Sequence, residues 1–175
     1  MPPVKPPAKL DLADYLPYLV NRVGTIIAEQ FGADALARHG LSIAEWRVLA
    51  VLASSGGQRQ IDLADLTSIE ASTLSRLVSR LVRTGLVTRT RSANSNREVV
   101  VKLSTKGQTL VARLIPIAHD YEAAAIAGLS ASELASLKRC LRRMYGNMKS
   151  KDVARVEQSE TRGGQSRLNA APGFR

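Results

Sequence analysis

The stretch of sequence that decides the fold is residues 60–103, which read QIDLADLTSIEASTLSRLVSRLVRTGLVTRTRSANSNREVVVKL. Apolar side chains recur within it at the i, i+3, i+4, i+7 spacing of one buried helical stripe, namely at Leu74, Leu77, Val78 and Leu81. Gly85 follows where a helix commonly ends in a left-handed residue, so that Leu86 can fold back onto Leu81. The pattern predicts a helix over residues 71–84 with one face buried.

The other face of this helix has the chemistry that suits a DNA groove. It carries small hydroxyl groups and arginines, namely Ser72, Thr73, Ser75, Arg76, Ser79, Arg80 and Arg83. Residues 71–97 contain six arginines and no acidic residue. Short hydroxyl groups permit close approach, and guanidinium groups reach phosphates or the O6 and N7 edge of guanine. A solvated surface helix is the alternative, but such a helix usually mixes charges of both signs. The composition therefore favours a DNA-reading helix.

The neighbouring segments indicate a helix-turn-helix followed by a hairpin. Residues 61–66 predict a short helix and residues 67–69 a tight connection, and two short helices joined in this way make a helix-turn-helix. Downstream, residues 86–90 and 99–103 are β-branched and partly alternating, and residues 92–96 between them are typical of a turn. These features predict an arginine-bearing hairpin, or wing.

Two runs carry a resemblance to a known family. They are LADLTSIEASTLSRLVSRLVRTGLVTR at residues 63–89 and NREVVVKLSTKG at residues 96–107. In order and spacing they resemble the MarR-type winged helix-turn-helix regulators, where a recognition helix is followed by "GLV.R" and by a wing closing on "V.LT..G". The resemblance extends over roughly residues 11–149. One departure is Ser95, because the family commonly has an Asp there that helps hold the wing arginine, here Arg97.

The resemblance implies a fold and a division of the chain. The fold is expected to be mainly α with a small β-hairpin wing (α+β), a winged helix-turn-helix with N- and C-terminal dimerisation helices. The division expected is a flexible arm at 1–10, dimerisation helices at 11–40 and 104–150, the DNA-binding module at 41–103, and a basic, mobile tail at 151–175.

Local signals mark the ends of the outer helices. Ser42 with Glu45, and Ser130 with Glu133, have the spacing of capping boxes, which start helices. Pro17 interrupts the first apolar stripe, so we expect a kink there or a helix whose first turn begins there.

The apolar stripes of the first and last helices lie far from the winged module in sequence. We expect them to pack on a second copy of the chain, through Leu12, Leu16, Leu19, Leu137, Leu141, Met144 and Met148. A two-fold homodimer would present two recognition helices to successive major grooves. The family dimerises through its terminal helices, as the resemblance implies.

The net charge of +10 is unevenly distributed. Residues 55–106 have nine basic and four acidic residues, and residues 138–175 have ten basic and three acidic. This clustering indicates binding to a polyanion.

No stretch approaches the roughly 20 apolar residues of a membrane span, and the N-terminus lacks the apolar run of a signal peptide. We therefore expect a cytoplasmic protein.

The DNA-contacting residues can be given roles. Candidates for base edges and nearby phosphates are Ser72, Thr73, Ser75, Arg76 and Arg80, with Ser79 and Arg83 on the same face. Arg97 is expected to enter the flanking minor groove, with Arg89 and Arg91 on the DNA backbone.

The chain has little that suits catalysis or metal binding. His39 and His119 are far apart, and no nucleophile pattern, phosphate loop or metal-ligand spacing occurs. We expect no enzyme activity, no cofactor and no metal. Cys140, the only cysteine, excludes an internal disulfide, and we favour a buried structural thiol over a redox sensor.

The resemblance also implies a small-molecule effector, a small aromatic or phenolic acid or its thioester, bound between the dimerisation helices and the winged module. Candidate residues are Tyr15, Tyr18, Arg22, His39, Trp46 and Arg47, since a basic group beside aromatic side chains suits an aromatic carboxylate. The alternative is that Tyr15 and Trp46 are core and helix-staple residues, and that Arg22 and His39 are solvated or capping.

The sequence thus predicts a homodimeric transcriptional repressor that recognises a pseudo-palindromic duplex. One alternative is an effector-independent architectural DNA-binding protein. Another is a protein-interaction module that uses the basic face on an acidic partner.

Overall fold

The computed structural model describes the backbone of residues 10–92 and 95–168, and the side chains of residues 10–90 and 99–150. The chain divides into two compact units, one ending at Ala125 and the other beginning at Ile126. The part of the chain that is described contains no helix long and apolar enough to cross a membrane.

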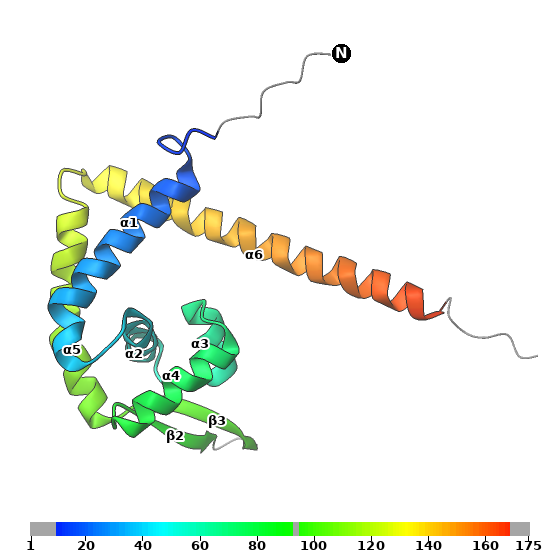
Figure 1. The fold of residues 1–175 in the computed structure, drawn as a ribbon, viewed down its shortest axis with the longest axis horizontal. Coiled ribbons are helices and arrows are strands. Elements are labelled where there is room, and N and C mark those ends of the chain that lie inside the picture. Colours follow the sequence, from blue (N-terminus) through cyan, green and yellow to red (C-terminus); the bar gives the residue numbers. More distant parts are fainter. Residues whose placement is uncertain (1–9, 93–94, 169–175) are drawn as a thin grey trace, which may run out of the picture. The chain divides into compact units, whose positions relative to one another are not determined.

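The first unit contains seven helical segments and three short strands (Figure 1). In chain order these are α1 (Leu16–Phe31), a π-helical turn (Gly32–Leu36), a 3-10 turn (Ala37–His39), α2 (Ile43–Ser55), β1 (Gln58–Arg59), α3 (Gln60–Thr67), α4 (Ala71–Arg83), β2 (Val87–Ser92), β3 (Ser95–Leu103) and α5 (Thr105–Ala125). The second unit contains the long helix α6 (Ala131–Leu168). The predicted mainly helical fold with a small wing is confirmed.

Helix α4 is held by a wholly aliphatic underside. Leu74, Val78 and Leu81 are fully buried, as the apolar stripe predicts, whereas Leu77 is only half-buried. Their partners in the core include Leu49 of α2 and Leu63 of α3. Since burying one such side chain stabilises a fold by about 1.5–3 kcal/mol, this cluster fixes α4 firmly on the module.

The wing is a three-stranded antiparallel sheet in the order β1-β3-β2. The hairpin of β2 and β3 was predicted from the sequence. In the structure Val87 pairs with Leu103, and the pairing is irregular at Arg91 and Ser92. The short strand β1, in which Gln58 pairs with Val101, was not predicted. Two residues are too few to show an alternating pattern, so the sequence does not reveal this strand. The pairing of β1 depends on the edge of β3 that β2 leaves free.

The predicted helix caps are present. The Ser42 side chain accepts a hydrogen bond from the Glu45 amide, and the Glu45 carboxylate accepts one from the Ser42 amide. Gly85 has φ 72°, the left-handed value expected at the end of α4. The Leu86 amide then donates to the Leu81 carbonyl over 2.9 Å, as the motif requires.

Several helix boundaries differ from those expected. Helix α1 begins at Leu16 with Pro17 in its first turn, so Leu12 precedes the helix. Helix α6 continues to Leu168, although the sequence predicted a mobile tail from residue 151. No proline interrupts that segment before Pro172, and Gly163 and Gly164 cost a helix only about 1 kcal/mol each.

Candidate nucleic-acid interface

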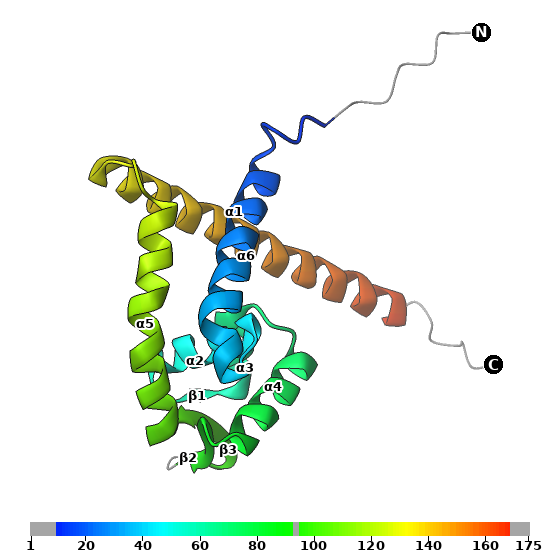
Figure 2. The same cartoon turned by 60° about the vertical axis from the view of Figure 1, so that its left-hand side comes forward.

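The proposed reading surface is the outer face of α4, which lies beside the wing (Figure 2). Ser72, Thr73, Arg76 and Arg83 are exposed. Ser75 and Ser79, also predicted on this face, are half-buried. The rigid underside and the exposed hydroxyl and guanidinium groups give α4 the form of a recognition helix.

Glu70 caps the N-terminus of α4, a role that sequence reasoning missed. Its carboxylate accepts hydrogen bonds from the Ser72 hydroxyl and from the amides of Ser72 and Thr73, at 2.9 and 3.0 Å respectively. These bonds, the hydroxyl first, lower the pKa of Glu70 from 4.5 to about 2. Amide groups that could bind a phosphate at this helix end are thus already occupied by a carboxylate.

Protonation of Glu70 is expected to destabilise the first turn of α4. Because the folded-state pKa is lowered, this stabilisation is present above pH 4.5 and is lost as the pH falls toward about 2. Urea unfolding at pH 5 and pH 3 measures it in the wild type and in Glu70→Gln. Asp62 and Glu133 also have lowered pKa values, but both groups are present in the wild type and in the variant, so their contribution cancels in the comparison. Equal losses in the two proteins would contradict the prediction.

Two arginines from different elements have partners on α4 itself. The Arg76 guanidinium lies 3.5 Å from the Thr73 hydroxyl, one turn earlier. From β2, the Arg89 guanidinium donates to the Ser79 hydroxyl over 3.0 Å, and that hydroxyl donates to the Ser75 carbonyl over 2.8 Å. The Ser79 hydroxyl therefore serves to position Arg89, and Ser72 and Thr73 remain the exposed hydroxyl residues.

Arg80, one of the predicted DNA contacts, has partners within the module itself. Its Nε is 3.2 Å from the carboxylate of Glu45, which is 1% exposed, and its Nη2 donates to the Gly40 carbonyl over 3.0 Å. In the single chain a buried carboxylate thus holds the Arg80 guanidinium, and its expected contact with base edges or nearby phosphates stays a prediction. Arg80 ties α4 to the start of α2.

The wing arginines are described only in part. Arg91 lies in β2 and Arg97 in β3, but the side chains of residues 91–98 are outside the described part of the structure. Their expected contacts with the DNA backbone and the minor groove stay predictions, as does the consequence of Ser95 for Arg97.

The six effector candidates are not brought together in the described residues. Trp46 packs edge-on against Phe31, with ring centroids 5.3 Å apart, which is the core role left open as the alternative. Arg22 lies over the Tyr18 ring at 5.7 Å on α1, and Tyr15 precedes that helix. Arg47 lines one cavity with residues of α1, and His39 lines a different one.

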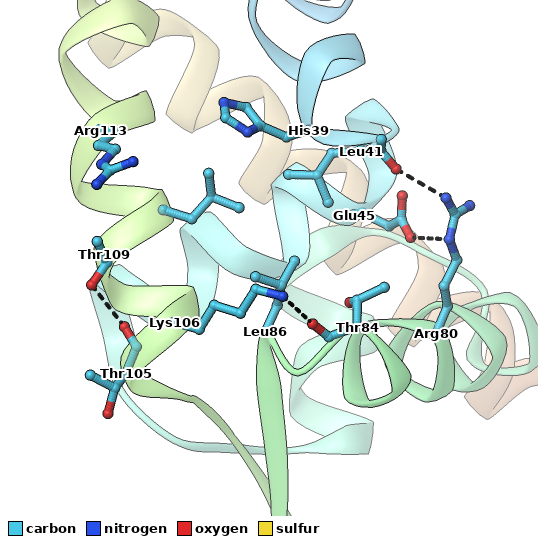
Figure 3. Close-up of a pocket in the computed structure, with 12 residues that line it drawn as sticks. His39, Leu41, Glu45, Arg80, Thr84, Leu86, Thr105, Lys106, Thr109 and Arg113 are labelled. Atoms are coloured by element: carbon cyan, nitrogen blue, oxygen red, sulfur yellow. Dashed lines mark hydrogen bonds and ion pairs between the residues drawn. The ribbon is translucent and has the colours of Figure 1, made fainter.

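The cavity that contains His39 also contains Arg80 (Figure 3). It has a volume of about 520 Å³ and lies between the 3-10 turn, α2, the end of α4 and α5. Lys106 and Arg113 of α5 line it and were not among the candidates. Their spacing of seven residues, two helical turns, is the signal that could have found them.

The apolar residues expected at a dimer interface are largely uncovered in the single chain. Leu12, Leu16, Leu19, Leu137, Leu141 and Met148 are between 38% and 60% exposed. Met144 is half-buried.

Cys140 is exposed, so the prediction of a buried thiol is wrong for the single chain. Its neighbours on α6 are exposed in the single chain too. Among the described residues, no cluster of three potential metal ligands occurs.

Comparison with known proteins identifies the family. A model described as the MarR family matches residues 39–98, from the end of the 3-10 turn into the wing. The chain belongs to the MarR family. The HTH-type transcriptional repressor Rv2887 of Mycobacterium tuberculosis is 29% identical over 137 residues, which is 77% of this chain and 98% of that repressor.

Solved structures of MarR proteins have the same fold. A MarR family regulator from Silicibacter pomeroyi matches with a TM-score of 0.73 and 29% identity, over 83% of this chain and 97% of that one. A mutant of MarR from E. coli, complexed with operator DNA, matches with a TM-score of 0.65 and 25% identity, over 74% of this chain and 92% of that one. This MarR-family chain is a DNA-binding transcriptional regulator of the winged helix-turn-helix type.

Proposed function

We propose that this regulator is a repressor that acts in the cytoplasm as a homodimer on a pseudo-palindromic operator and is released by a small aromatic or phenolic acid or its thioester. The observation that carries the proposal is the reading face of α4. There Ser72, Thr73 and Arg76 are exposed above a fully buried aliphatic underside. A rigid helix with this face suits the major groove, where guanidinium and hydroxyl groups read base edges.

The exposed apolar residues support the dimer. On α1 the uncovered side chains include Leu16, Leu19 and Val23, and on α6 they include Leu137 and Leu141. Such surfaces on a monomer usually mark a protein interface, and a second copy of the chain would cover them. A dimer presents two copies of α4 to half-sites roughly 34–36 Å apart, one turn of DNA.

Repression would follow from occlusion of a promoter by the bound dimer. An effector that binds more tightly to a conformation with a different separation of the two α4 helices would shift the population away from DNA binding. The family resemblance supports an aromatic acid as that effector, and the cationic cavity beside α4 could accept one.

Arg76→Ala is expected to weaken binding to the selected operator and to relax base preference at one position of each half-site. If Arg76 is bidentate to guanine, the loss is ~1–3 kcal/mol per contact. Competition titrations with operator and with single-base variants measure it. Arg47→Ala removes the same charge from α2 and serves as the control.

Equal losses on every sequence would show that Arg76 contacts only phosphate. An effector-independent architectural protein is the alternative function. It predicts similar affinity for operator and random duplex, and no release by aromatic acids.

A further inference from the structure

Glu70 places one negative charge at the start of a reading face that is otherwise cationic. It directly precedes residues 71–97, which contain six arginines and no acidic residue. Its side chain is exposed, although it caps α4. Serine and threonine are the usual caps and carry no charge, whereas a carboxylate beside DNA is repelled by the phosphates. Capping alone therefore does not explain a glutamate at this position.

The Glu70 carboxylate has a fixed orientation and can accept a further donor. Its Oε2 atom accepts from the Ser72 hydroxyl, from the Ser72 amide over 2.9 Å and from the Thr73 amide over 3.0 Å. Among the described residues, its Oε1 atom accepts only from the Ser72 amide, over 3.0 Å. Because a carboxylate has about four acceptor positions, two on each oxygen, Oε1 has one left. The same bonds, that of the hydroxyl first, keep the pKa of Glu70 at about 2, so the group is ionised at neutral pH.

Glu70 lies within reach of the same base pairs as Arg76. The Thr73 residue connects them, since its amide donates to Glu70 and its hydroxyl lies 3.5 Å from the Arg76 guanidinium. Six residues of helix span about 9 Å, which corresponds to no more than about three base pairs of DNA. The N-terminal residues of a recognition helix are those that contact base edges in the major groove. On such a helix, Glu70 would face bases.

The four bases differ in what they offer a carboxylate. In the major groove guanine presents two acceptors and thymine one, and adenine has an acceptor beside its amino donor. Cytosine presents only its amino donor. We propose that Glu70 is a specificity-determining residue whose carboxylate accepts a hydrogen bond from the amino group of one cytosine in each half-site. This inference rests on the proposed function, because it requires α4 in the major groove. It adds an acidic residue to DNA contacts that were expected to be hydroxyl and cationic groups alone.

Selection of bound duplexes from a random pool, with the full-length wild type and two variants, tests the assignment. The wild type is expected to enrich cytosine at one position of each half-site, within about three base pairs of the guanine that Arg76 would read. Glu70→Ser removes the carboxylate but keeps a preferred helix cap, and it should lose the cytosine preference. Glu70→Gln should change the preference to adenine, because a side-chain amide pairs with both N6 and N7 of that base.

Competition titrations at one salt concentration measure the size of the effect. For the wild type, replacing the selected cytosine in one half-site should weaken binding about tenfold or more. In Glu70→Ser the same replacement should change the affinity less than about twofold. Its affinity for random duplex should rise, since a negative charge has been removed from the reading face. Glu29→Gln removes the same charge from α1 and should behave as the wild type in both titrations.

The outcomes separate a failure of this inference from a failure of the proposed function. A cytosine preference that persists in Glu70→Ser, or a selected operator without that cytosine, would overturn the role of Glu70 and leave the specific regulator intact. Equal loss of preference at every position of the half-site in Glu70→Ser would show that Glu70 acts only on the fold of α4, and would also overturn it. Enrichment of no sequence by the wild type would overturn the inference together with the proposed function.

Discussion

Replacing Leu141 by aspartate is expected to convert the protein from dimer to monomer and to lower operator affinity by about 10²–10⁴-fold. The affinity falls because two linked half-site contacts become one. Leu141 is 38% exposed in the single chain and lies on one stripe of α6 with Leu137 and Met148. A carboxylate buried in the apolar interface that we propose would be unpaired and costly. Light scattering gives the mass, and an operator titration gives the affinity.

The matched control is Ser150→Asp, which adds the same charge to α6. Ser150 is nine residues from Leu141, two and a half helical turns, and is therefore on the opposite face. This variant should remain dimeric and keep its operator affinity. A dimeric mass for Leu141→Asp would refute the assignment of this face to the interface.

Gly107→Ala is expected to destabilise the first unit by about 3 kcal/mol or more. A Cβ atom at Gly107 would lie 2.0 Å from the Leu86 carbonyl oxygen and 3.0 Å from the Leu86 carbonyl carbon. The obstacle is backbone, and that carbonyl also accepts the Ser104 amide over 3.0 Å. The start of α5 must therefore move away from the α4–β2 connection, and overpacking of this kind is costly. Urea unfolding measures the loss.

Gly24→Ala provides the control for glycine replacement. A Cβ at Gly24, within α1, would meet nothing within 4 Å. This variant should be unchanged or more stable, by up to about 0.5–1 kcal/mol, because alanine favours a helix. Similar stabilities for the two variants would show that the approach of α5 to Leu86 is not tight.

The local features of the fold could be predicted because their causes are local. The apolar stripe of α4, the left-handed Gly85 and the two capping boxes each depend on residues within one or two turns, and all are present. Membership in the MarR family followed from the order of these features. Strand β1 and the length of α6 were missed, because neither leaves a periodic pattern in the sequence.

The site was less predictable because its contacts join distant segments. Arg80 belongs to the reading face by helical spacing, yet Glu45, 35 residues earlier, holds its guanidinium. Glu70 lies immediately before residues 71–97, which contain no acidic residue, and the sequence pattern did not mark it as the cap of α4. Lys106 and Arg113 share a helix face, but only the fold places that face against the end of α4.

The central claim is that paired α4 helices read a specific duplex, and selection from a random pool of duplexes tests it most directly. Wild-type protein should enrich one pseudo-palindromic sequence with half-sites about one helical turn apart. At a single stated salt concentration it should bind that sequence at least about 10³-fold more tightly than random duplex. Enrichment of no sequence, with equal affinity for operator and random DNA, would contradict the account.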